Sequence, residues 1–116
     1  MKLYETQLDA DTMIVTPHFG MGEFRYREFH MESSSLRRDL GGPDVKNLVI
    51  DLHDANYFGS EFIGMMIMLS KAVTGKGGTA AICNASEQML EVLKTMNMDK
   101  IVPMFSTREE ALSSFG

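Results

Sequence analysis

The residues of this sequence best placed to do chemistry are Ser60 and Glu61, at the predicted start of an apolar helix. Free backbone N–H groups and the positive end of the helix dipole favour negative charge at such a position. The Ser60 hydroxyl is placed to cap the helix by accepting a backbone N–H. The Glu61 carboxylate is a first-turn acid that the helix dipole favours.

The other reactive side chains are scattered along the sequence. Cys83 ends an apolar run with no adjacent histidine or basic residue, which indicates a packed thiol and not a nucleophile. His18, His30 and His53 show no metal-ligand spacing, so we expect loop or surface histidines. No set of residues forms a nucleophile–base pair, a paired acid and base or a metal site. We therefore expect a binding protein, not an enzyme, with no cofactor and no metal.

Length and charge restrict the possible classes of protein further. With 116 residues we expect one domain spanning positions 1–116. The net charge of −5 argues against a nucleic-acid or anionic-membrane partner, because either would require a basic face. A single cysteine allows no intrachain disulfide, and the N-terminal residues contain no long apolar run. We therefore expect a cytoplasmic location; the oligomeric state stays open.

The elements that must position Ser60 and Glu61 follow from hydrophobic spacing. Residues 3–8 and 12–16 are strand-like, and a turn joins them. A helical stripe at Phe29, Ser33, Leu36 and Leu40 comes next. The later predicted elements are a buried strand at 48–52, a helix capped by Ser60, a strand at 79–83, a helix opened by a capping box at 84–87, a strand at 101–105 and a last helix opened by a second capping box at 107–110.

This order of elements, β-β-α-β-α-β-α-β-α, predicts an α/β fold. Strands that alternate with helices after an opening hairpin form a mixed sheet with helices packed against it. We expect four to five strands flanked by about four helices.

The sequence resembles the STAS domain, or anti-sigma factor antagonist, family. That family has a strand ending in D-L, a short loop and D-S-[ST]-G-L-G at the start of a helix; here the strand is L48-V-I-D-L52 and the helix start is G59-S-E-F-I-G64. G22-E-F24 falls where the family commonly ends its second strand with G-E-L. The resemblance continues to the last predicted helix, so it implies a STAS-like fold for nearly the whole chain.

The resemblance implies partner switching. Such a domain docks an anti-sigma factor, often a serine kinase of the histidine-kinase-like ATPase type, and phosphorylation of the second hydroxyl in the motif ends the docking. That hydroxyl falls on Glu61, a permanent negative charge where the family carries a phosphoryl group, so we expect the protein not to be switched in the usual way. Ser60 occupies the first hydroxyl of the motif, which the resemblance makes the other candidate acceptor. Gly59 and Phe62 also depart from the motif. The alternative hypothesis is a small-ligand-binding or scaffold STAS sensor that uses the groove at the Gly59–Gly64 helix start.

The helix from Ser60 to Thr74 carries more apolar surface than one buried stripe requires. Phe62, Met66, Leu69 and Val73 form the expected inward line, whereas Met68 projects to the far side. Either other elements cover the excess, or the methionines form a deformable docking surface. The expected partner-binding residues are Gly59, Phe62, Gly64, Met65 and Met68.

Overall fold

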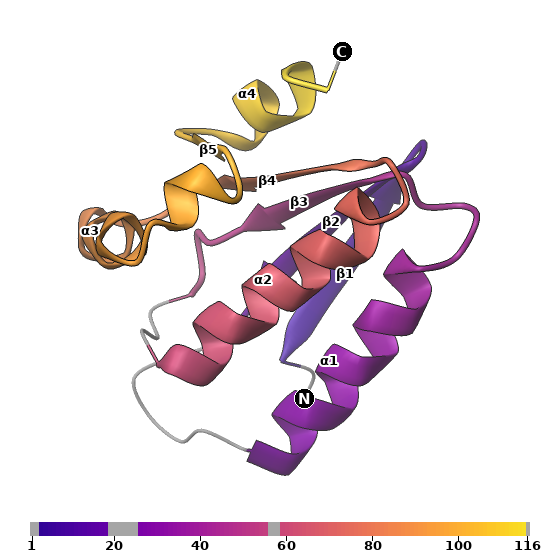
Figure 1. Ribbon diagram of the computed structural model, residues 1–116, viewed down its shortest axis with the longest axis horizontal. Coiled ribbons are helices and arrows are strands. Elements are labelled where there is room, and N and C mark those ends of the chain that lie inside the picture. The colour runs from indigo at the N-terminus through magenta and orange to yellow at the C-terminus, as the bar shows by residue number, and fades with distance from the viewer. Residues whose placement is uncertain (1–2, 19–25, 56–58, 116) are drawn as a thin grey trace.

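The computed structural model describes residues 3–18, 26–55 and 59–115. Strands and helices alternate after an opening hairpin, as expected from the sequence (Figure 1). The elements are β1 (Tyr4–Asp9), β2 (Thr12–Pro17), α1 (Tyr26–Leu40), β3 (Asn47–Asp51), α2 (Ser60–Thr74), β4 (Thr79–Cys83), α3 (Glu87–Thr95), the 3-10 helix η1 (Met98–Lys100), β5 (Met104–Phe105) and α4 (Arg108–Ser113).

The five strands form one mixed sheet in the order β1-β2-β3-β4-β5. β1 is antiparallel to β2, whereas β2, β3, β4 and β5 run parallel to one another. In the register Ile50 lies beside Ile82, and Asp51 beside Cys83. The predicted α/β fold with a mixed sheet is therefore confirmed.

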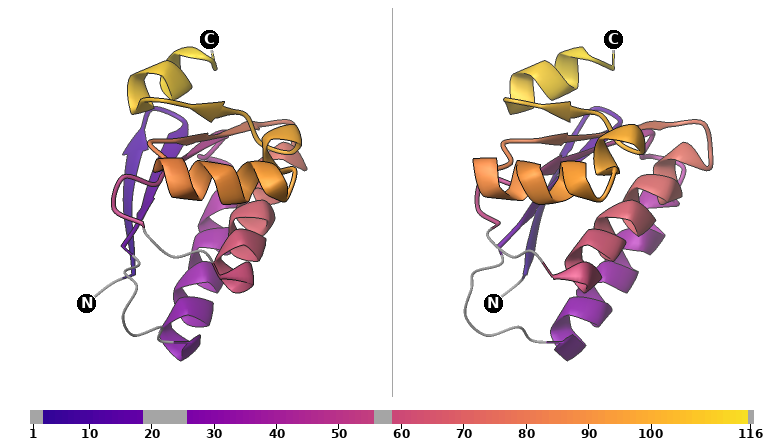
Figure 2. Two further views of the ribbon diagram at one scale, coloured as in Figure 1. Left: turned by 90° about the vertical axis from the view of Figure 1, so that its left-hand side faces the viewer. Right: turned by 60° about the vertical axis from the view of Figure 1, so that its left-hand side comes forward.

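Helices cover both faces of the sheet. α1 and α2 lie side by side on one face and run in the same direction (Figure 1). Met89 and Leu93 of α3 pack into the core on that face, whereas Ala111 of α4 packs against the opposite face of β3 and β4 (Figure 2). Side chains point alternately to the two faces along each strand. Ile50 of β3 therefore faces α2, whereas its neighbour Val49 faces α4.

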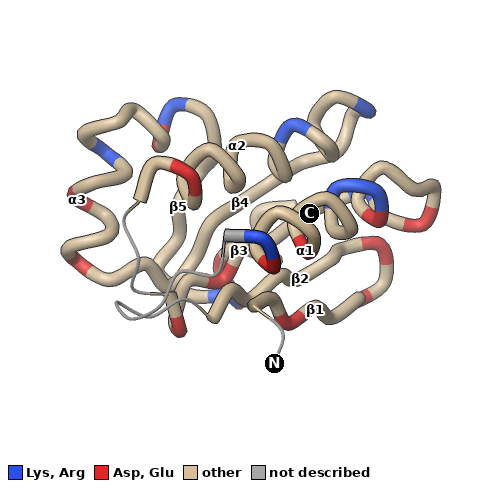
Figure 3. Tube along the Cα trace, turned by 90° about the horizontal axis from the view of Figure 1, so that it is seen from below, with Lys and Arg blue, Asp and Glu red and all other residues tan. Residues whose placement is uncertain are grey.

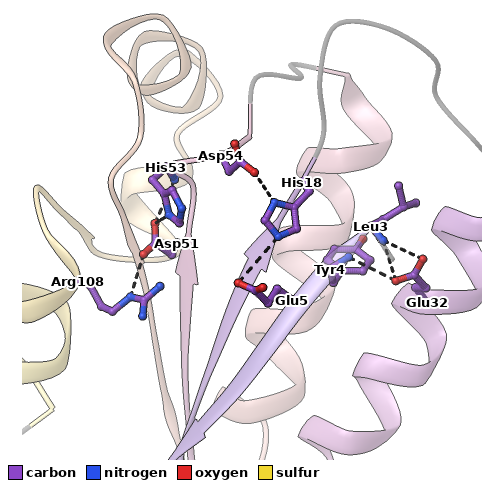
Figure 4. Close-up of polar contacts among 9 residues, drawn as sticks. All are labelled: Leu3, Tyr4, Glu5, His18, Glu32, Asp51, His53, Asp54 and Arg108. Atoms are coloured by element: carbon purple, nitrogen blue, oxygen red, sulfur yellow. Dashed lines mark hydrogen bonds and ion pairs between the residues drawn. The ribbon is translucent and has the colours of Figure 1, made fainter. Parts of the chain in front are cut away.

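The edge strand β1 is fixed to α1 by its first residues. The Glu32 carboxylate accepts hydrogen bonds from the backbone N–H groups of Leu3, at 3.0 Å, and Tyr4, at 3.3 Å (Figure 4). The Tyr4 hydroxyl lies 2.7 Å from the Ser33 Oγ atom in the core, and burial raises the pKa of Tyr4. These contacts fix the start of β1 to the inner side of α1.

Two boundaries differ from the sequence prediction. The strand expected at 101–105 contains only Met104–Phe105, because the chain first forms the 3-10 helix η1. The capping box expected at 84–87 is also wrong: Ser86 caps α3 by accepting the Met89 N–H at 3.1 Å. Asn84 instead adopts a left-handed conformation, with φ of 58°, which asparagine tolerates better than most residues. At the second predicted box Thr107 is confirmed as the cap of α4, since its Oγ1 atom accepts the Glu110 N–H at 3.1 Å.

Two further observations concern a segment outside the described residues and the apolarity of the helices. The segment Gly22-Glu-Phe24, used above for the family resemblance, lies outside the described residues. Among the residues that the structure places, no helix combines the length and apolarity needed to cross a membrane.

Candidate functional site

The site forms at the first turn of α2, beyond the carboxyl end of β3. Gly59 is the N-cap, with φ of −64° and ψ of 147°, and its carbonyl accepts the N–H groups of Phe62, at 3.1 Å, and Ile63, at 3.2 Å. Ser60 is the first residue of the helix, so the prediction that it caps α2 is wrong. Glycine is itself an acceptable cap residue, and the chain enters the helix one residue earlier than expected. Ser60 is exposed.

Glu61 lies in the first turn of α2 and faces α1. Its side chain is 46% exposed, and its Oε2 atom lies 3.7 Å from Nε2 of His30. The His30 ring packs edge-on against Phe29, with 5.4 Å between the ring centroids. The carboxylate therefore combines a favourable helix-dipole position with a neighbouring imidazole, and it remains accessible to a partner.

A groove between α1 and α2 extends from Glu61 along the outer side of α2. Two cavities share Gly64 and Met68 and together form what we call the α1–α2 groove. One has a volume of about 410 Å³ and is lined by Phe29, His30, Ser33, Ser34, Glu61, Gly64, Met65 and Met68. The other, of about 390 Å³, is lined by Arg37, Gly64, Ile67, Met68, Lys71 and Ala72.

The expected partner-binding residues differ in their access to this groove. The expected inward line of α2 is confirmed, because Phe62, Met66, Leu69 and Val73 are fully buried. Phe62 and Met65 are 0% and 4% exposed, so they support the surface from within the core and present almost no area to a partner. Gly64 is exposed, and Gly59 and Met68 are half-buried, which confirms that Met68 is at least partly exposed.

A second polar cluster surrounds Asp51 at the carboxyl end of β3 (Figure 4). This carboxylate is 1% exposed and accepts hydrogen bonds from the Arg108 Nε atom, at 2.9 Å, and the Asn84 Nδ2 atom, at 3.1 Å. The backbone nitrogen of His53 lies 3.0 Å from the Asp51 Oδ1 atom, and the His53 Nδ1 atom lies 2.8 Å from the same oxygen. Burial alone would raise the pKa of Asp51, but the hydrogen bonds from His53, Asn84 and Arg108 outweigh it and lower this pKa.

The Asp51 cluster was not identified from the sequence. One sequence signal pointed to this cluster: Asp51 ends β3 and Asn84 directly follows β4, and the carboxyl ends of these neighbouring strands meet at the same edge of the sheet. Arg108 lies 57 residues away in the chain, and no local spacing indicates its contact with Asp51. Because the cluster joins β3, β4 and α4, it holds the sheet edge from which the loop to α2 departs.

The histidines have carboxylate neighbours that sequence spacing did not indicate. His18, after β2, contacts Asp54 through its Nδ1 atom, and its Nε2 atom lies 4.0 Å from Glu5 of β1 (Figure 4). His53 is about half exposed, in agreement with the expected surface position. No group of three or more His, Cys, Asp and Glu side chains within the described ranges is arranged to hold a metal ion.

Cys83 is fully buried beside Asp51, as expected for a packed thiol. Burial, followed by the nearby Asp51 carboxylate, raises the pKa of the Cys83 thiol to about 12. The thiolate is the nucleophilic form of cysteine, so this residue stays in its unreactive form at neutral pH.

An opening hairpin, a mixed sheet with four parallel strands and a helix that begins beyond the carboxyl end of β3 define a STAS-like α/β fold. The family model for the STAS domain matches residues 12–111, and the chain belongs to this family. A putative anti-sigma factor antagonist of Thermotoga maritima is 30% identical over 110 residues, which cover 95% of each chain.

Solved structures share the fold. An anti-sigma-factor antagonist (STAS) domain protein from Planctomyces limnophilus has a TM-score of 0.79 and 25% identity, over 97% of each chain. The Bacillus cell fate determinant SpoIIAA in its phosphorylated form has a TM-score of 0.72 and 14% identity, over 96% of this chain and 97% of that one. The latter similarity concerns the fold alone.

Proposed function

We propose that this protein is an anti-sigma factor antagonist: a non-catalytic, cytoplasmic module that docks an anti-sigma factor and so frees a sigma factor. Its membership of the STAS family and its similarity to the Thermotoga maritima relative support this role. The partner class that the resemblance implies is a serine kinase of the histidine-kinase-like ATPase type. Docking uses the start of α2, with Gly59, Ser60, Glu61, Gly64 and Met68 at the surface and with Phe62 and Met65 beneath it.

The observation that carries the proposal is the position of Glu61 in the first turn of α2, with its side chain 46% exposed. This is the place at which the family resemblance puts the phosphorylated hydroxyl. Glu61 has no hydroxyl to form the phosphate ester that switches the family, so we infer that the usual switch is lost at position 61. Ser60 is the neighbouring hydroxyl, exposed at the first residue of α2.

Glu61 imitates a phosphoryl group only in part. A phosphoserine carries a charge of about −1.5 to −2 and three acceptor oxygens, whereas a glutamate carries one charge and two oxygens. The His30 imidazole lies 3.7 Å from the Glu61 carboxylate, and in its protonated form it offsets part of the negative charge of Glu61. The charge at this position is therefore weaker than that of a phosphoryl group, and we infer that docking persists.

The direct test is isothermal titration of the protein with each anti-sigma factor encoded beside its gene. The proposal expects one of them to bind, with an affinity that prior incubation with ATP does not change. Failure of all of them to bind at concentrations up to about 1 mM, the weak end of specific recognition, would contradict the antagonist role.

The α1–α2 groove supports a second candidate, a small-ligand sensor. Its cavity of about 410 Å³ falls within the range of small-molecule sites, and Phe29, Met65 and Met68 give it an apolar lining. Glu61 at this cavity disfavours an anion, so a neutral apolar molecule suits it better. Titration with n-decanol followed by NMR would show shifts at these residues if this candidate is correct, and none if the groove binds only proteins.

A further inference from the structure

The outward stripe of α2 has an unusual composition. Glu61 in the first turn and Lys71 in the last are the two charged residues of this helix, and between them lie Gly64 and Met68. Figure 3 shows the acidic position near the start of α2 and the basic position near its end. Glu61, Gly64 and Lys71 are exposed, and Met68 is half-buried. Spacings of three and four residues place all four on one face of the helix, over a length of about 15 Å.

This stripe is self-complementary: it matches the same stripe of a second copy of α2 that runs antiparallel to it. The midpoint between Glu61 and Lys71 coincides with the midpoint between Gly64 and Met68, at position 66 of the helix. If two copies of α2 pack antiparallel about that point, each Glu61 faces a Lys71 and each Gly64 faces a Met68. Two-fold symmetry repeats both contacts, which is the property of an isologous interface.

Gly64 provides space for the methionine of the second copy. A Cβ atom added at Gly64 would meet no atom within 4 Å, so the position opens directly onto the groove. Glycine within a helix costs about 1 kcal/mol relative to alanine, and its lack of a side chain allows another backbone or side chain to approach closely. Methionine is flexible and polarisable, and it adapts readily to such a depression.

The neighbouring helix α1 adds a cation at the basic end of the groove and an imidazole at the acidic end. Arg37 lines the cavity that contains Lys71, and His30 lines the cavity that contains Glu61. The basic end of the groove is thus strengthened by a second cation, placed where it would face Glu61 of the other copy. The apolar middle of the groove comes from Ile67, Met68 and Ala72, which are all half-buried in the monomer.

We propose that the α1–α2 groove is a homodimer interface, in which α2 of one protein packs antiparallel against α2 of a second copy. The self-complementary order acid–glycine–methionine–lysine carries this proposal, which goes beyond the proposed function and does not rest on it. Because the interface covers Glu61 and the start of α2, dimer formation competes with docking of any partner at that helix start. Protein concentration then sets how much of the surface is available.

Charge reversal tests the pairing. Glu61→Lys and Lys71→Glu each place like charges opposite one another in the dimer, so each variant alone should raise the dimer dissociation constant by about tenfold or more. An equimolar mixture of the two variants places opposite charges at both contacts, as does the double variant Glu61→Lys/Lys71→Glu. Sedimentation equilibrium should therefore show dimers in the mixture and in the double variant.

Two controls make the result specific to this face. Lys94→Glu reverses an exposed charge in the last turn of α3 and should leave the association unchanged. Gly64→Leu fills the depression on the exposed side of α2 and should abolish dimers while circular dichroism shows an unchanged fold. Both the altered charges and the added leucine lie at exposed positions, so loss of folding is not expected.

Three results would overturn the proposal. The first is a wild-type protein that stays monomeric up to about 1 mM. The second is a dimer that neither single reversal weakens, because another face must then form it. The third is a monomeric protein whose binding to an anti-sigma factor is lost in Gly64→Leu, which would assign the groove to that partner instead of to a second copy.

Discussion

The Asp51 carboxylate at the end of β3 accepts a hydrogen bond of 2.9 Å from the Arg108 Nε atom in the first turn of α4. Asp51 is 1% exposed and Arg108 31% exposed, so the guanidinium covers the carboxylate from the solvent side. A buried carboxylate is tolerated when it is paired and fully hydrogen-bonded. The contact therefore fixes the C-terminal helix to the central strand of the sheet.

We predict that Arg108→Met destabilises the fold by about 2 kcal/mol, because a hydrogen bond to a buried charged group is lost. The measurement is the free energy of unfolding in urea at pH 7. Arg38→Met is the matched control, since Arg38 is exposed on α1, and it should change stability by less than about 0.5 kcal/mol. Equal effects of both substitutions would show that the Asp51–Arg108 pair contributes nothing.

The lowered pKa of Asp51 predicts an acid-dependent loss of stability. A carboxyl whose pKa is lower in the folded than in the unfolded chain stabilises the fold above its unfolded value of 3.8. This contribution disappears as the pH falls from about 4 through the lower folded pKa. Asp51→Asn should thus flatten the decline of the free energy of unfolding below pH 4. An unchanged slope would mean that Asp51 has the same pKa in both states.

Gly64 and Gly78 should respond in opposite ways to alanine. At Gly64 an added Cβ meets nothing within 4 Å, so Gly64→Ala should stabilise the protein by about 1 kcal/mol through helix propensity. At Gly78 the added Cβ would lie 1.8 Å from the backbone oxygen of Lys46, so Gly78→Ala should destabilise it. Thermal unfolding of both variants checks the pair. A destabilised Gly64→Ala would show that this position is not open.

Met68→Glu should weaken partner binding while leaving stability nearly unchanged, within about 1 kcal/mol, because Met68 is only half-buried. Met66 is fully buried on the same helix, and Met66→Ala should cost about 2–5 kcal/mol. Met96→Glu, at an exposed methionine after α3, should affect neither property. Thermal unfolding and titration with the anti-sigma factor provide the two readouts. A large loss of stability in Met68→Glu would assign Met68 to the core.

Local patterns predicted the fold well. Thr79–Cys83 was predicted at its observed bounds, because a short apolar run between glycines and an asparagine defines a buried strand. Helix starts were less accurate: α2 is capped by Gly59 and not Ser60, and α3 by Ser86 and not Asn84. In each case a neighbouring residue of similar capping ability took the position, and the sequence does not distinguish them.

The site was harder to predict than the fold. The position of Glu61 followed from the strand–loop–helix pattern, since the first helical turn is defined locally. The Asp51–Arg108 and His30–Glu61 contacts depend on how distant elements pack, which no spacing within the sequence specifies. The same holds for Phe62 and Met65, whose burial depends on the packing of α2 against α1 and the sheet.

We propose that Glu61 replaces the phosphorylated hydroxyl of the family, so that docking is no longer switched off. The most direct measurement is mass spectrometry of the wild type and of Glu61→Ser after incubation with the neighbouring kinases and ATP. We predict that the wild type remains unmodified and bound, whereas Glu61→Ser gains one phosphoryl group at position 61 and dissociates. Efficient phosphorylation of Ser60 in the wild type, with release of the partner, would contradict the account and move the regulatory site by one residue.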